Sequence, residues 1–453
     1  MKPVVALVGR PNVGKSTLFN RLTRSRAAIV SDEPGVTRDR QYGDGLMGDR
    51  PYYVVDTGGI SEGLHARAGG DALRAPILVQ VRQALAEADA IIFLVDAREG
   101  INPLDRDIAN DLRRLGKPVT VAVNKAEGMD AASAASEFHA LGLGMPWSIS
   151  SAHGDGIAEL MEHVLAPLPR VPEAQTPSDV PRVAVVGRPN AGKSTLVNAL
   201  LGEERVIVSD QPGTTRDSIE VPLERAGKAY VVIDTAGVRR RARVEEAVEK
   251  FSAIKTLQAL DQANVVILVL DAQAGIGEQD ATLAGYVLKR GRALIVTLNK
   301  WDAIDKSARE WVKREFERKL AFLDFAPVHY ISALQGTGIG NLFASVDRAF
   351  ASANRELPTP RLNRILHTAT SSTPPPLVRG RRIRLKFAHQ GGRNPPVVVI
   401  HGNQVRSLSA SYRRYLAHAF HKAFHLVGTP VVIQCREGEN PFKGKAPHRR
   451  RRR

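Results

Sequence analysis

Cysteine is almost missing from this chain of 453 residues, since Cys435 is the only one. A single thiol excludes an intrachain disulfide, and we therefore expect a reducing compartment, the cytoplasm. Cys435 ends the predicted strand Thr429 to Cys435, so we expect a buried strand residue rather than a reactive nucleophile. Long hydrophobic runs are missing as well, because none approaches the roughly 18 residues that a membrane helix needs. The first apolar run directly follows Met1-Lys2-Pro3, so neither a signal peptide nor a membrane partner is expected.

Acidic residues are scarce only in the C-terminal part of the chain. From Arg355 to Arg453 there are 21 lysines and arginines against three acids, whereas the preceding residues contain 43 basic and 44 acidic side chains. The formal net charge of +17 therefore comes from this one part. Such a distribution predicts a polyanionic partner, with nucleic acid favoured over a membrane surface. DNA is not among the partners that we expect.

A glycine-rich motif occurs twice. Gly9 to Ser16 reads GRPNVGKS, and Gly187 to Ser194, 178 residues further on, reads GRPNAGKS. Each copy follows a short apolar run and precedes a helical pattern, which is the context of the phosphate-binding loop G-x-x-x-x-G-K-[ST]. The backbone N–H groups of such a loop and the N-terminus of the next helix surround a polyphosphate. The alternative is that both motifs are merely solvated glycine turns, but such turns would not be expected to recur in this context.

The side chains of the two loops have separate expected roles. Lys15 and Lys193 should reach the β- and γ-phosphates, and the hydroxyls of Ser16 and Ser194 should hold Mg²⁺. The loop residues predicted to contact the nucleotide are Gly9, Arg10, Pro11, Asn12, Val13, Gly14, Lys15 and Ser16, and Gly187, Arg188, Pro189, Asn190, Ala191, Gly192, Lys193 and Ser194.

Two further motifs recur at the same spacing of 178 residues. Thr37 and Thr215 lie in P-G-x-T-R-D segments, where a hydroxyl completes the Mg²⁺ shell only while the γ-phosphate is present, so hydrolysis would release the loop. Asp56 and Asp234 begin D-x-x-G, which predicts a carboxylate near Mg²⁺ and a glycine N–H near the γ-phosphate. The predicted metal ligands are Ser16, Thr37, Asp56, Ser194, Thr215 and Asp234. The predicted nucleotide contacts in D-x-x-G are Asp56, Thr57, Gly58, Gly59 and Ile60, and Asp234, Thr235, Ala236, Gly237 and Val238.

A further motif predicts contacts to the nucleotide base that favour guanine over adenine. Asn299-Lys300-Trp301-Asp302 fits N-K-x-D, whose aspartate accepts hydrogen bonds from the N1–H and N2–H₂ groups of guanine. In the first half the carboxylate is Glu127, whose extra methylene implies either a loop that is set back or a weaker hold on guanine. GTP is expected in both halves, with a Ser-Ala pair, repeated at a spacing of 181, supporting guanine O6 by a backbone N–H. The predicted base contacts are Asn124, Lys125, Ala126, Glu127, Ser151 and Ala152, and Asn299, Lys300, Trp301, Asp302, Ser332 and Ala333.

Apolar runs lead into these motifs, and helical stretches of mixed polarity separate them. This alternation predicts an α/β fold with a mostly parallel sheet and flanking helices in each half, and the motifs on loops at the carboxyl ends of the strands. We expect these domains at residues 1–168 and 182–354, with a proline-rich linker at 169–181. The predicted strands are Tyr53 to Val55, Ile91 to Val95, Val119 to Val123, Tyr230 to Ile233, Val265 to Leu270 and Leu294 to Leu298.

Residues 355–440 predict a third, small α+β domain, and residues 441–453 a disordered basic tail. One helix is expected from Tyr412 to Val427, with a solvated basic face that includes His421 and His425. These two histidines stand four residues apart, but no third ligand is evident, so a metal site is not favoured. The predicted strands are Arg382 to Phe387, Pro396 to His401 and Thr429 to Cys435, with Gly391-Gly392 in a strand connection.

The duplicated G-R-P-N-x-G-K-S-T-L and P-G-x-T-R-D segments resemble the tandem-GTPase family of bacterial ribosome-assembly factors called EngA or Der, over essentially the whole chain. The resemblance implies two P-loop GTPase domains, a KH-like C-terminal domain, and hydrolysis of GTP to GDP and phosphate. It also implies maturation of the large ribosomal subunit, with rRNA and ribosomal protein as partners of a protein that we expect to be monomeric. No G-x-x-G loop, which clamps single-stranded RNA in KH domains, occurs from Arg355 onward. Salt-sensitive phosphate contacts are expected instead.

Two positions bear on the rate of hydrolysis. Ile60 and Val238 stand where Ras-like enzymes place a water-orienting glutamine, so slow intrinsic turnover is expected. Asn12 and Asn190 resemble the asparagines of GTPases in which K⁺ acts in place of an arginine finger, which suggests K⁺-stimulated turnover. An asparagine that only shapes the loop is the alternative. The residues expected to carry hydrolysis are Lys15, Lys193, Asn12, Asn190, Thr37 and Thr215.

Two functions are compatible with these features. In the first, the GTP state docks on pre-ribosomal RNA and hydrolysis releases the enzyme. In the second, the chain is an RNA-binding scaffold whose domain arrangement depends on nucleotide occupancy alone, and hydrolysis is incidental.

Overall fold

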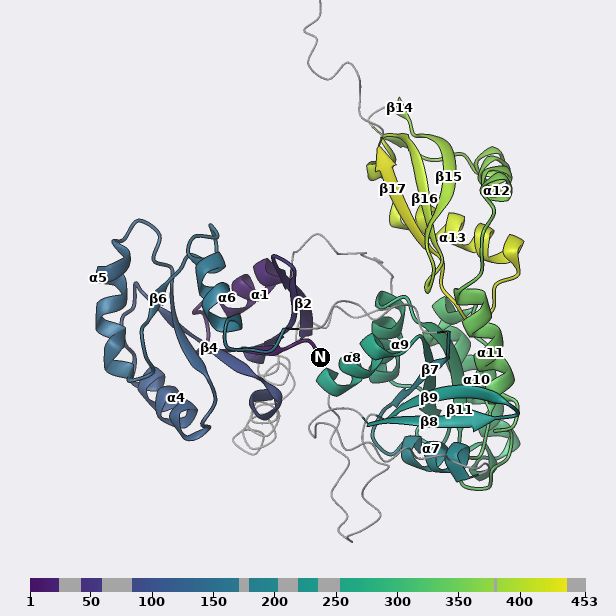
Figure 1. Cartoon of the computed structure of the whole chain (residues 1–453), viewed down its shortest axis with the longest axis horizontal. Coiled ribbons are helices and arrows are strands. Elements are labelled where there is room, and N and C mark those ends of the chain that lie inside the picture. The colour runs from purple at the N-terminus through teal and green to yellow at the C-terminus, as the bar shows by residue number, and fades with distance from the viewer. Residues whose placement is uncertain are drawn as a thin grey trace, which may run out of the picture. The chain divides into compact units, whose positions relative to one another are not determined.

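The structure is a computed structural model that describes residues 1–23, 42–58, 84–170, 179–202, 219–234, 253–378 and 381–437 (Figure 1). The first α/β domain forms one compact unit, and the second α/β domain forms another together with the C-terminal domain. Most of the predicted linker and the whole predicted tail lie outside the described residues, and the domain boundaries stay predictions. In the described ranges, no helix has both the length and the apolar character needed to cross a bilayer.

The first domain contains a sheet with the strand order β2-β3-β1-β4-β5-β6 in the described residues. Only β2 runs antiparallel to its neighbour. The strands are β1 (Val4–Val8), β2 (Tyr42–Met47), β3 (Arg50–Asp56), β4 (Ala90–Asp96), β5 (Val119–Asn124) and β6 (Trp147–Ser148). The helices are α1 (Lys15–Leu22), α4 (Pro103–Arg114), α5 (Ala131–Ser136), the 3-10 helix η2 (Glu137–Leu141) and α6 (Ile157–Leu165).

The second domain repeats this topology strand for strand, in the order β8-β9-β7-β10-β11-β12. Here only β8 is antiparallel. The strands are β7 (Arg182–Gly187), β8 (Ile219–Arg225), β9 (Lys228–Asp234), β10 (Val265–Asp271), β11 (Ala293–Asn299) and β12 (Val328–Tyr330). The helices are α7 (Lys193–Gly202), α8 (Ala253–Gln262), α9 (Glu278–Lys289), the 3-10 helices η4 (Trp301–Ala303) and η5 (Ala321–Leu323), α10 (Lys306–Lys319) and α11 (Leu342–Ala353).

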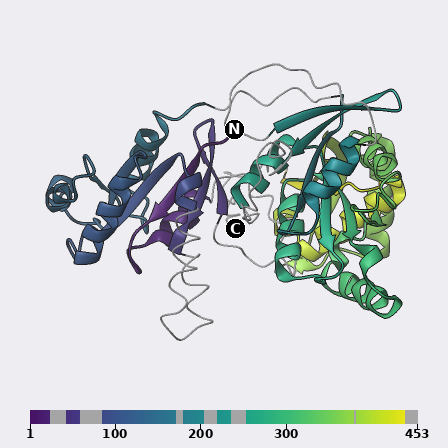
Figure 2. The same ribbon diagram turned by 90° about the horizontal axis from the view of Figure 1, so that it is seen from below.

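Central strands of both sheets are buried along their whole length, as β4 and β10 show. A strand that is covered on both faces is apolar at every position rather than at alternate ones, which explains the continuous apolar runs in the sequence. Helices flank each sheet in the two views of Figures 1 and 2. The predicted α/β class with mostly parallel sheets is confirmed, and each of the six predicted strands of these domains lies inside an observed one.

The C-terminal domain is a three-stranded sheet with two helices packed against it (Figure 1). The strand order is β15-β16-β17, with β15 antiparallel and β17 parallel to β16. Its elements are α12 (Thr359–Ser372), the short strands β13 (Leu377–Val378) and β14 (Arg381–Arg382), β15 (Arg384–Gly392), β16 (Val397–Asn403), the 3-10 helix η6 (Val405–Ser407), α13 (Ala410–Phe424) and β17 (Val432–Glu437). The α+β class predicted for this part is therefore confirmed.

Three details of this domain differ from the predictions. Helix α12 was not predicted, because Pro358-Thr359-Pro360 signals a break, yet proline is tolerated in the first turn of a helix. Gly391 and Gly392 end strand β15 instead of connecting two strands. Cys435 does lie in a strand and packs against the core, although it is only half-buried. Burial raises the pKa of its thiol.

The C-terminal domain is bonded to the second α/β domain through backbone groups. Gly428 accepts a hydrogen bond from the N–H of Leu294 on β11 at 2.6 Å and donates its own N–H to the carbonyl of Phe325 at 2.9 Å. His421 packs edge-on against the ring of Phe325, with the ring centroids 6.0 Å apart. Burial lowers the pKa of His421, so the solvated basic face predicted for α13 is wrong at this residue.

Candidate nucleotide-binding sites

The two phosphate-binding loops have the same local geometry. Each joins the central strand of its sheet to the following helix, β1 to α1 and β7 to α7. Asn12 and Asn190 adopt the left-handed backbone region, with φ of 68° and 61°, which asparagine tolerates better than most residues. Lys15 Nζ donates to the carbonyl of Arg10 at 2.7 Å, and Lys193 Nζ donates to the carbonyl of Arg188 at 2.8 Å. Both ammonium groups therefore lie across their loops.

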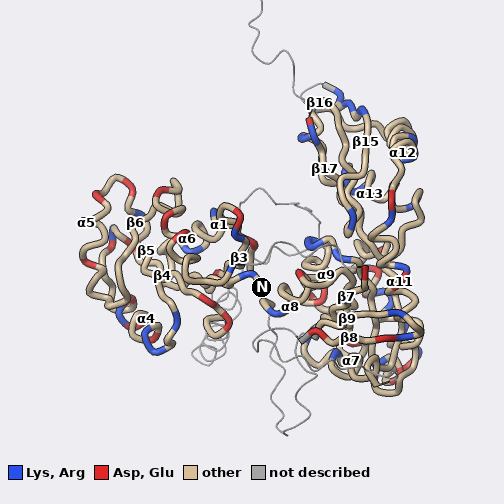
Figure 3. Tube along the Cα trace, viewed as in Figure 1, with Lys and Arg blue, Asp and Glu red and all other residues tan. Residues whose placement is uncertain are grey.

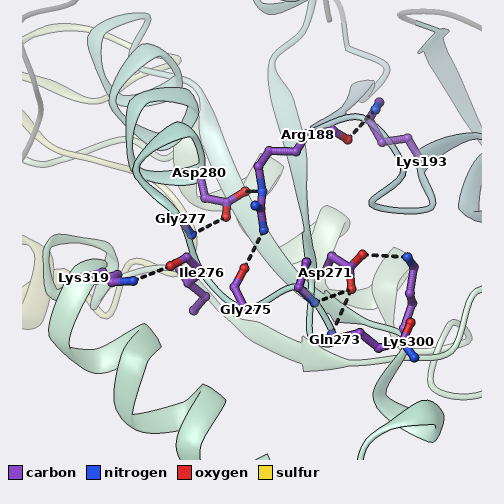
Figure 4. Close-up of polar contacts among 11 residues, drawn as sticks. Arg188, Lys193, Asp271, Gln273, Gly275, Ile276, Gly277, Asp280, Lys300 and Lys319 are labelled. Atoms are coloured by element: carbon purple, nitrogen blue, oxygen red, sulfur yellow. Dashed lines mark hydrogen bonds and ion pairs between the residues drawn. The ribbon is translucent and has the colours of Figure 1, made fainter. Parts of the chain in front are cut away.

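A carboxylate far along the chain holds the arginine of each loop. In the second domain Arg188 Nε lies 2.8 Å from Asp280 Oδ1, and Asp280 Oδ2 accepts the N–H of Gly277 at 2.9 Å (Figure 4). Arg188 also donates to the carbonyl of Gly275 at 2.5 Å. Burial raises the pKa of Asp280, while the Gly277 N–H and the Arg188 guanidinium oppose that shift.

The first domain has the equivalent contacts. Arg10 Nε lies 3.4 Å from Asp105 Oδ2, which also accepts the N–H of Asn102 at 3.1 Å. Arg10 Nη1 makes a second ion pair with Glu99 at 2.7 Å. Both arginines lie in the predicted loop motifs, whereas their carboxylate partners could not be predicted from the sequence, because Asp105 and Asp280 belong to no nucleotide-binding motif.

Oxygen atoms suited to a divalent cation meet at the end of β3. Ser16 Oγ donates to Asp56 Oδ2 at 2.9 Å, and Gly58 N donates to Asp56 Oδ1 at 2.9 Å. Hydroxyl and carboxylate oxygens are ligands that Mg²⁺ accepts, with phosphate oxygens and water completing its shell. In the described ranges no group of three or more His, Cys, Asp or Glu residues gathers to hold a metal alone.

Some of the other residues predicted to contact the phosphates or Mg²⁺ lie in the described ranges, and others lie outside them. Thr57 Oγ1 donates to the carbonyl of Leu7 on β1 at 2.6 Å, which fixes the start of D-x-x-G in the first domain. In the second domain Ser194 lies in the first turn of α7 and Asp234 ends β9. The residues outside the described ranges are Thr37, Gly59, Ile60, Thr215, Thr235, Ala236, Gly237 and Val238.

A cavity of about 230 Å³ lies at the predicted guanine site of the second domain. Asn299 connects this base site to the phosphate loop, since its Nδ2 donates to the carbonyl of Ala191 at 2.8 Å and its Oδ1 accepts the N–H of Ala333 at 2.9 Å. Lys300 Nζ pairs with Asp271 at 2.6 Å. The cavity is lined by Gly192, Thr195, Gln273, Asn299, Lys300, Asp302, Ala303, Ser332, Ala333 and Leu334.

The first domain repeats the asparagine bridge. Asn124 Nδ2 donates to the carbonyl of Val13 at 2.7 Å, and its Oδ1 accepts the N–H of Ser151 at 2.8 Å. Lys125 Nζ pairs with Asp96 at 2.6 Å, as Lys300 does with Asp271. Phosphate loop and base loop are thus joined by one side chain in each domain.

The hydrogen bonds correct the repeat register at the last base motif. His153 N donates to Ser150 Oγ at 3.2 Å, as Gln335 N donates to Ser332 Oγ at 3.2 Å. Ser150-Ser151 therefore corresponds to Ser332-Ala333, with a spacing of 182 rather than the predicted 181. Ser151 holds the position of Ala333, and Ala152 lies one residue beyond it.

Glu127 is the main difference between the two base sites. Its Oε1 lies 2.6 Å from Arg98 Nη2, and Gln273 takes the place of this arginine in the second domain. Both residues follow a strand-ending aspartate by two positions and donate their backbone N–H to its Oδ1 at 2.9 Å. Hydrogen bonds from the Glu127 backbone N–H and the Ser150 hydroxyl lower the pKa of the Glu127 carboxyl, and the charge of Arg98 adds to this.

Comparison with known proteins gives full-length similarity. The profile of the family described as "50S ribosome-binding GTPase" matches residues 4–125 and 182–300. The profile described as "KH-domain-like of EngA bacterial GTPase enzymes, C-terminal" matches residues 356–436.

Curated relatives match over nearly the whole chain. Proteins named "GTPase Der" from Chromobacterium violaceum and Thiobacillus denitrificans are 57% and 58% identical to it over 98% of its length, and the alignments cover 93% and 94% of those proteins. The protein of the same name from Azoarcus sp. is 57% identical, over 98% of this chain and 100% of its own.

Proposed function

Because this chain belongs to the Der (EngA) family of tandem GTPases, we propose that its GTP state docks on the large ribosomal subunit during assembly and that hydrolysis releases it. The chain is a GTPase with two P-loop domains and a KH-like domain. One observation carries the docking part of the proposal. The basic KH-like domain is hydrogen-bonded through Gly428 to β11, the strand that ends in Asn299, which is predicted to contact guanine.

The residues of the site bind and orient the nucleotide in this proposal. Lys15 and Lys193 leave the carbonyls of their own loops to contact the β- and γ-phosphates. The base is held by Asn299 and Asp302 in the second domain, and by Asn124 and Glu127 in the first. A divalent cation, which we assign as Mg²⁺, neutralises charge that develops on the phosphates when it is bound. Ser16, Thr37 and Asp56 would hold it in one domain, and Ser194, Thr215 and Asp234 in the other.

Hydrolysis is proposed to be slow without a further activator. Ile60 and Val238 offer no hydrogen-bonding group to orient water. We propose that the side chains of Asn12 and Asn190 hold a K⁺ ion beside the phosphates, where its charge assists the reaction. The left-handed backbone of both residues equally fits a role in shaping the loop, so the two roles need separate tests.

Docking is proposed to use rRNA and ribosomal protein as partners. The residues that follow the second GTPase domain, 355–453, contain the whole basic excess of the chain, which is shared between the KH-like domain and the predicted tail. Lys and Arg, drawn in blue in Figure 3, occur at the end of the β15-β16-β17 sheet and along α13. Phosphate contacts from such a surface would be sequence-independent and sensitive to salt.

Co-sedimentation with purified ribosomal subunits tests the proposal. We expect the large subunit to retain the chain with a non-hydrolysable GTP analogue, to release it with GTP as hydrolysis proceeds, and not to retain it with GDP. Lys15→Ala and Lys193→Ala, tested separately, should show which domain controls retention. The small subunit serves as the control particle.

The outcomes separate the two functions. Equal release with GTP and with the analogue would favour the scaffold, in which occupancy alone sets the domain arrangement. Binding that is identical with GTP, GDP and no nucleotide would refute both.

A further inference from the structure

The C-terminal sheet packs on the helices with one face, and its opposite face is the feature of interest. Ala388, Val398 and Ile400 are buried in the core with residues of α12 and α13. Because side chains alternate along a strand, Phe387 on β15 and His401 on β16 point to the opposite face. These two residues are paired across the strands, so they lie side by side on that face.

Three rings are stacked on this face. The rings of Phe387 and His401 are nearly parallel, with an interplanar angle of 5° and centroids 4.4 Å apart. His389 continues the stack, 5.2 Å from His401 at an angle of 27°. Phe387 is nevertheless 46% exposed, one of the larger exposed fractions among the apolar side chains of the described residues. An aromatic ring that is held rigid by its neighbours but open to solvent is a surface on which another flat ring can stack.

Positive charge surrounds the stack. Arg436 on β17 is paired with His401 across the strands and is exposed. Desolvation lowers the pKa of His401, and the charges of His389 and Arg436 add to this shift. Lys386, also exposed, is the extra residue of a bulge beside Phe387. Glu437 is the only acidic residue in the three strands, and it lies 3.9 Å from Arg406. The face therefore favours an anionic partner.

We propose that this face, defined by Phe387, His389, His401 and Arg436, binds unpaired nucleobases of RNA by stacking. Flat rings beside cations are the combination by which proteins hold single-stranded nucleic acid, because the bases stack and the phosphates meet the positive charge. A duplex buries its bases and offers only phosphates and sugars to such a surface. The inference rests on the proposed docking to RNA and gives it a site on the sheet face, in a domain that lacks the G-x-x-G loop.

Binding of labelled RNA to the full-length chain tests the stacking. The probes are a single-stranded RNA of about a dozen nucleotides, the same strand with abasic positions, and a hairpin duplex, each followed by fluorescence anisotropy. Phe387→Ala is expected to weaken binding of the intact strand roughly tenfold, and to leave the abasic strand and the hairpin unchanged. Phe387→Trp, which keeps a ring, should retain the affinity and exclude misfolding as the cause.

Two variants control the result. Leu377→Ala removes another exposed apolar side chain of the same domain, with an exposed fraction of 62%, and should change nothing. Arg436→Ala should weaken all three probes and lower the salt dependence by about one counterion.

Three results would overturn the inference. Equal losses on intact and abasic strands would show that Phe387 acts through the fold and not through the bases. Unchanged RNA binding together with lost co-sedimentation of Phe387→Ala would assign the face to a protein partner. If the unmodified chain binds none of the RNA probes, the proposed docking to RNA is refuted together with the stacking. If the chain binds RNA and Phe387→Ala does not change its affinity, only the stacking is refuted.

Discussion

Arg188 and Asp280 form an ion pair of 2.8 Å that ties the phosphate-binding loop of the second GTPase domain to the first turn of α9 (Figure 4). The Asp280 side chain has no exposed surface, and the contacts of Arg10 with Asp105 repeat the arrangement in the first domain. The backbone N–H groups of the loop must converge on the phosphates. A side chain that holds the loop in place before the nucleotide arrives lowers the ordering cost of binding.

Asp280→Ala should therefore affect both stability and nucleotide binding. The substitution leaves the mostly buried guanidinium of Arg188 with the Gly275 carbonyl but without its carboxylate partner, and we expect the free energy of unfolding to fall by about 3 kcal/mol. Affinity of the second site for GDP should fall with it, because the loop becomes less ordered. Denaturant titration and binding of labelled GDP measure the two effects. Glu310→Ala, which breaks the exposed 3.0 Å pair with Lys313 in the same domain, is the control and should change neither.

The strands and loops of the nucleotide sites could be predicted from the sequence because their signals are local. Apolar runs predicted the central strands, and the motifs following them predicted which side chains meet at the carboxyl ends. The Arg188–Asp280 pair could not be predicted in this way, since its partners are 92 residues apart and Asp280 belongs to no motif. Packing of α9 beside the loop, and not sequence proximity, brings them together.

Arg98→Gln should tighten guanine binding at the first site. In our proposal the Glu127 carboxylate accepts hydrogen bonds from guanine, yet one of its oxygens lies 2.6 Å from Arg98. Gln273 occupies this position in the second domain, so the substitution makes the first site resemble the second. Since Arg98 is 57% exposed, we expect only a roughly two- to fivefold gain in affinity.

The measurement is a GDP titration in a chain that also contains Asp302→Ala, which we expect to remove guanine recognition from the second site. Arg114→Gln is a matched control, because this arginine is 81% exposed and pairs loosely with Asp111 at 3.9 Å on α4. Weaker binding by Arg98→Gln would show instead that the arginine positions Glu127 for the base.

The base motif of the first domain shows where sequence reasoning was limited. Sequence spacing aligned Ser151-Ala152 with Ser332-Ala333, and only the bonds of His153 and Gln335 to the serine hydroxyls revealed the shift by one residue. Helix α12 was missed for a related reason. Its prolines indicate a loop in the sequence, whereas the packing of Leu362 and Leu366 into the core stabilises a helix.

GTP turnover should be faster in KCl than in NaCl at matched ionic strength if Asn12 and Asn190 hold K⁺. Their left-handed backbone allows the two roles of the side chain to be separated. Asn190→Gly keeps that backbone accessible but removes the amide, so it should abolish the difference between the salts in the second domain while GDP binding is retained. Asn190→Ala should weaken GDP binding too, because alanine disfavours a φ of 61°. Equal rates of the unmodified chain in the two salts would leave the asparagines with a loop-shaping role only.

Gly428→Ala should loosen the C-terminal domain from the second GTPase domain. Gly428 has a φ of +67°, and a Cβ there would lie 2.8 Å from Ala349 Cβ and 3.1 Å from the carbonyl of Leu294, a residue whose N–H bonds to Gly428. Backbone strain and overpacking together should destabilise the interface by about 2–4 kcal/mol. Calorimetry should then show an earlier transition, and limited proteolysis should release the C-terminal domain. Gly227→Ala controls for backbone strain alone, since φ is +75° there with nothing within 4 Å of the new Cβ. Gly428 differs from Gly227 in its crowding and in its two backbone hydrogen bonds to the second GTPase domain, so equal effects of the two substitutions would contradict a close-packed contact at Gly428.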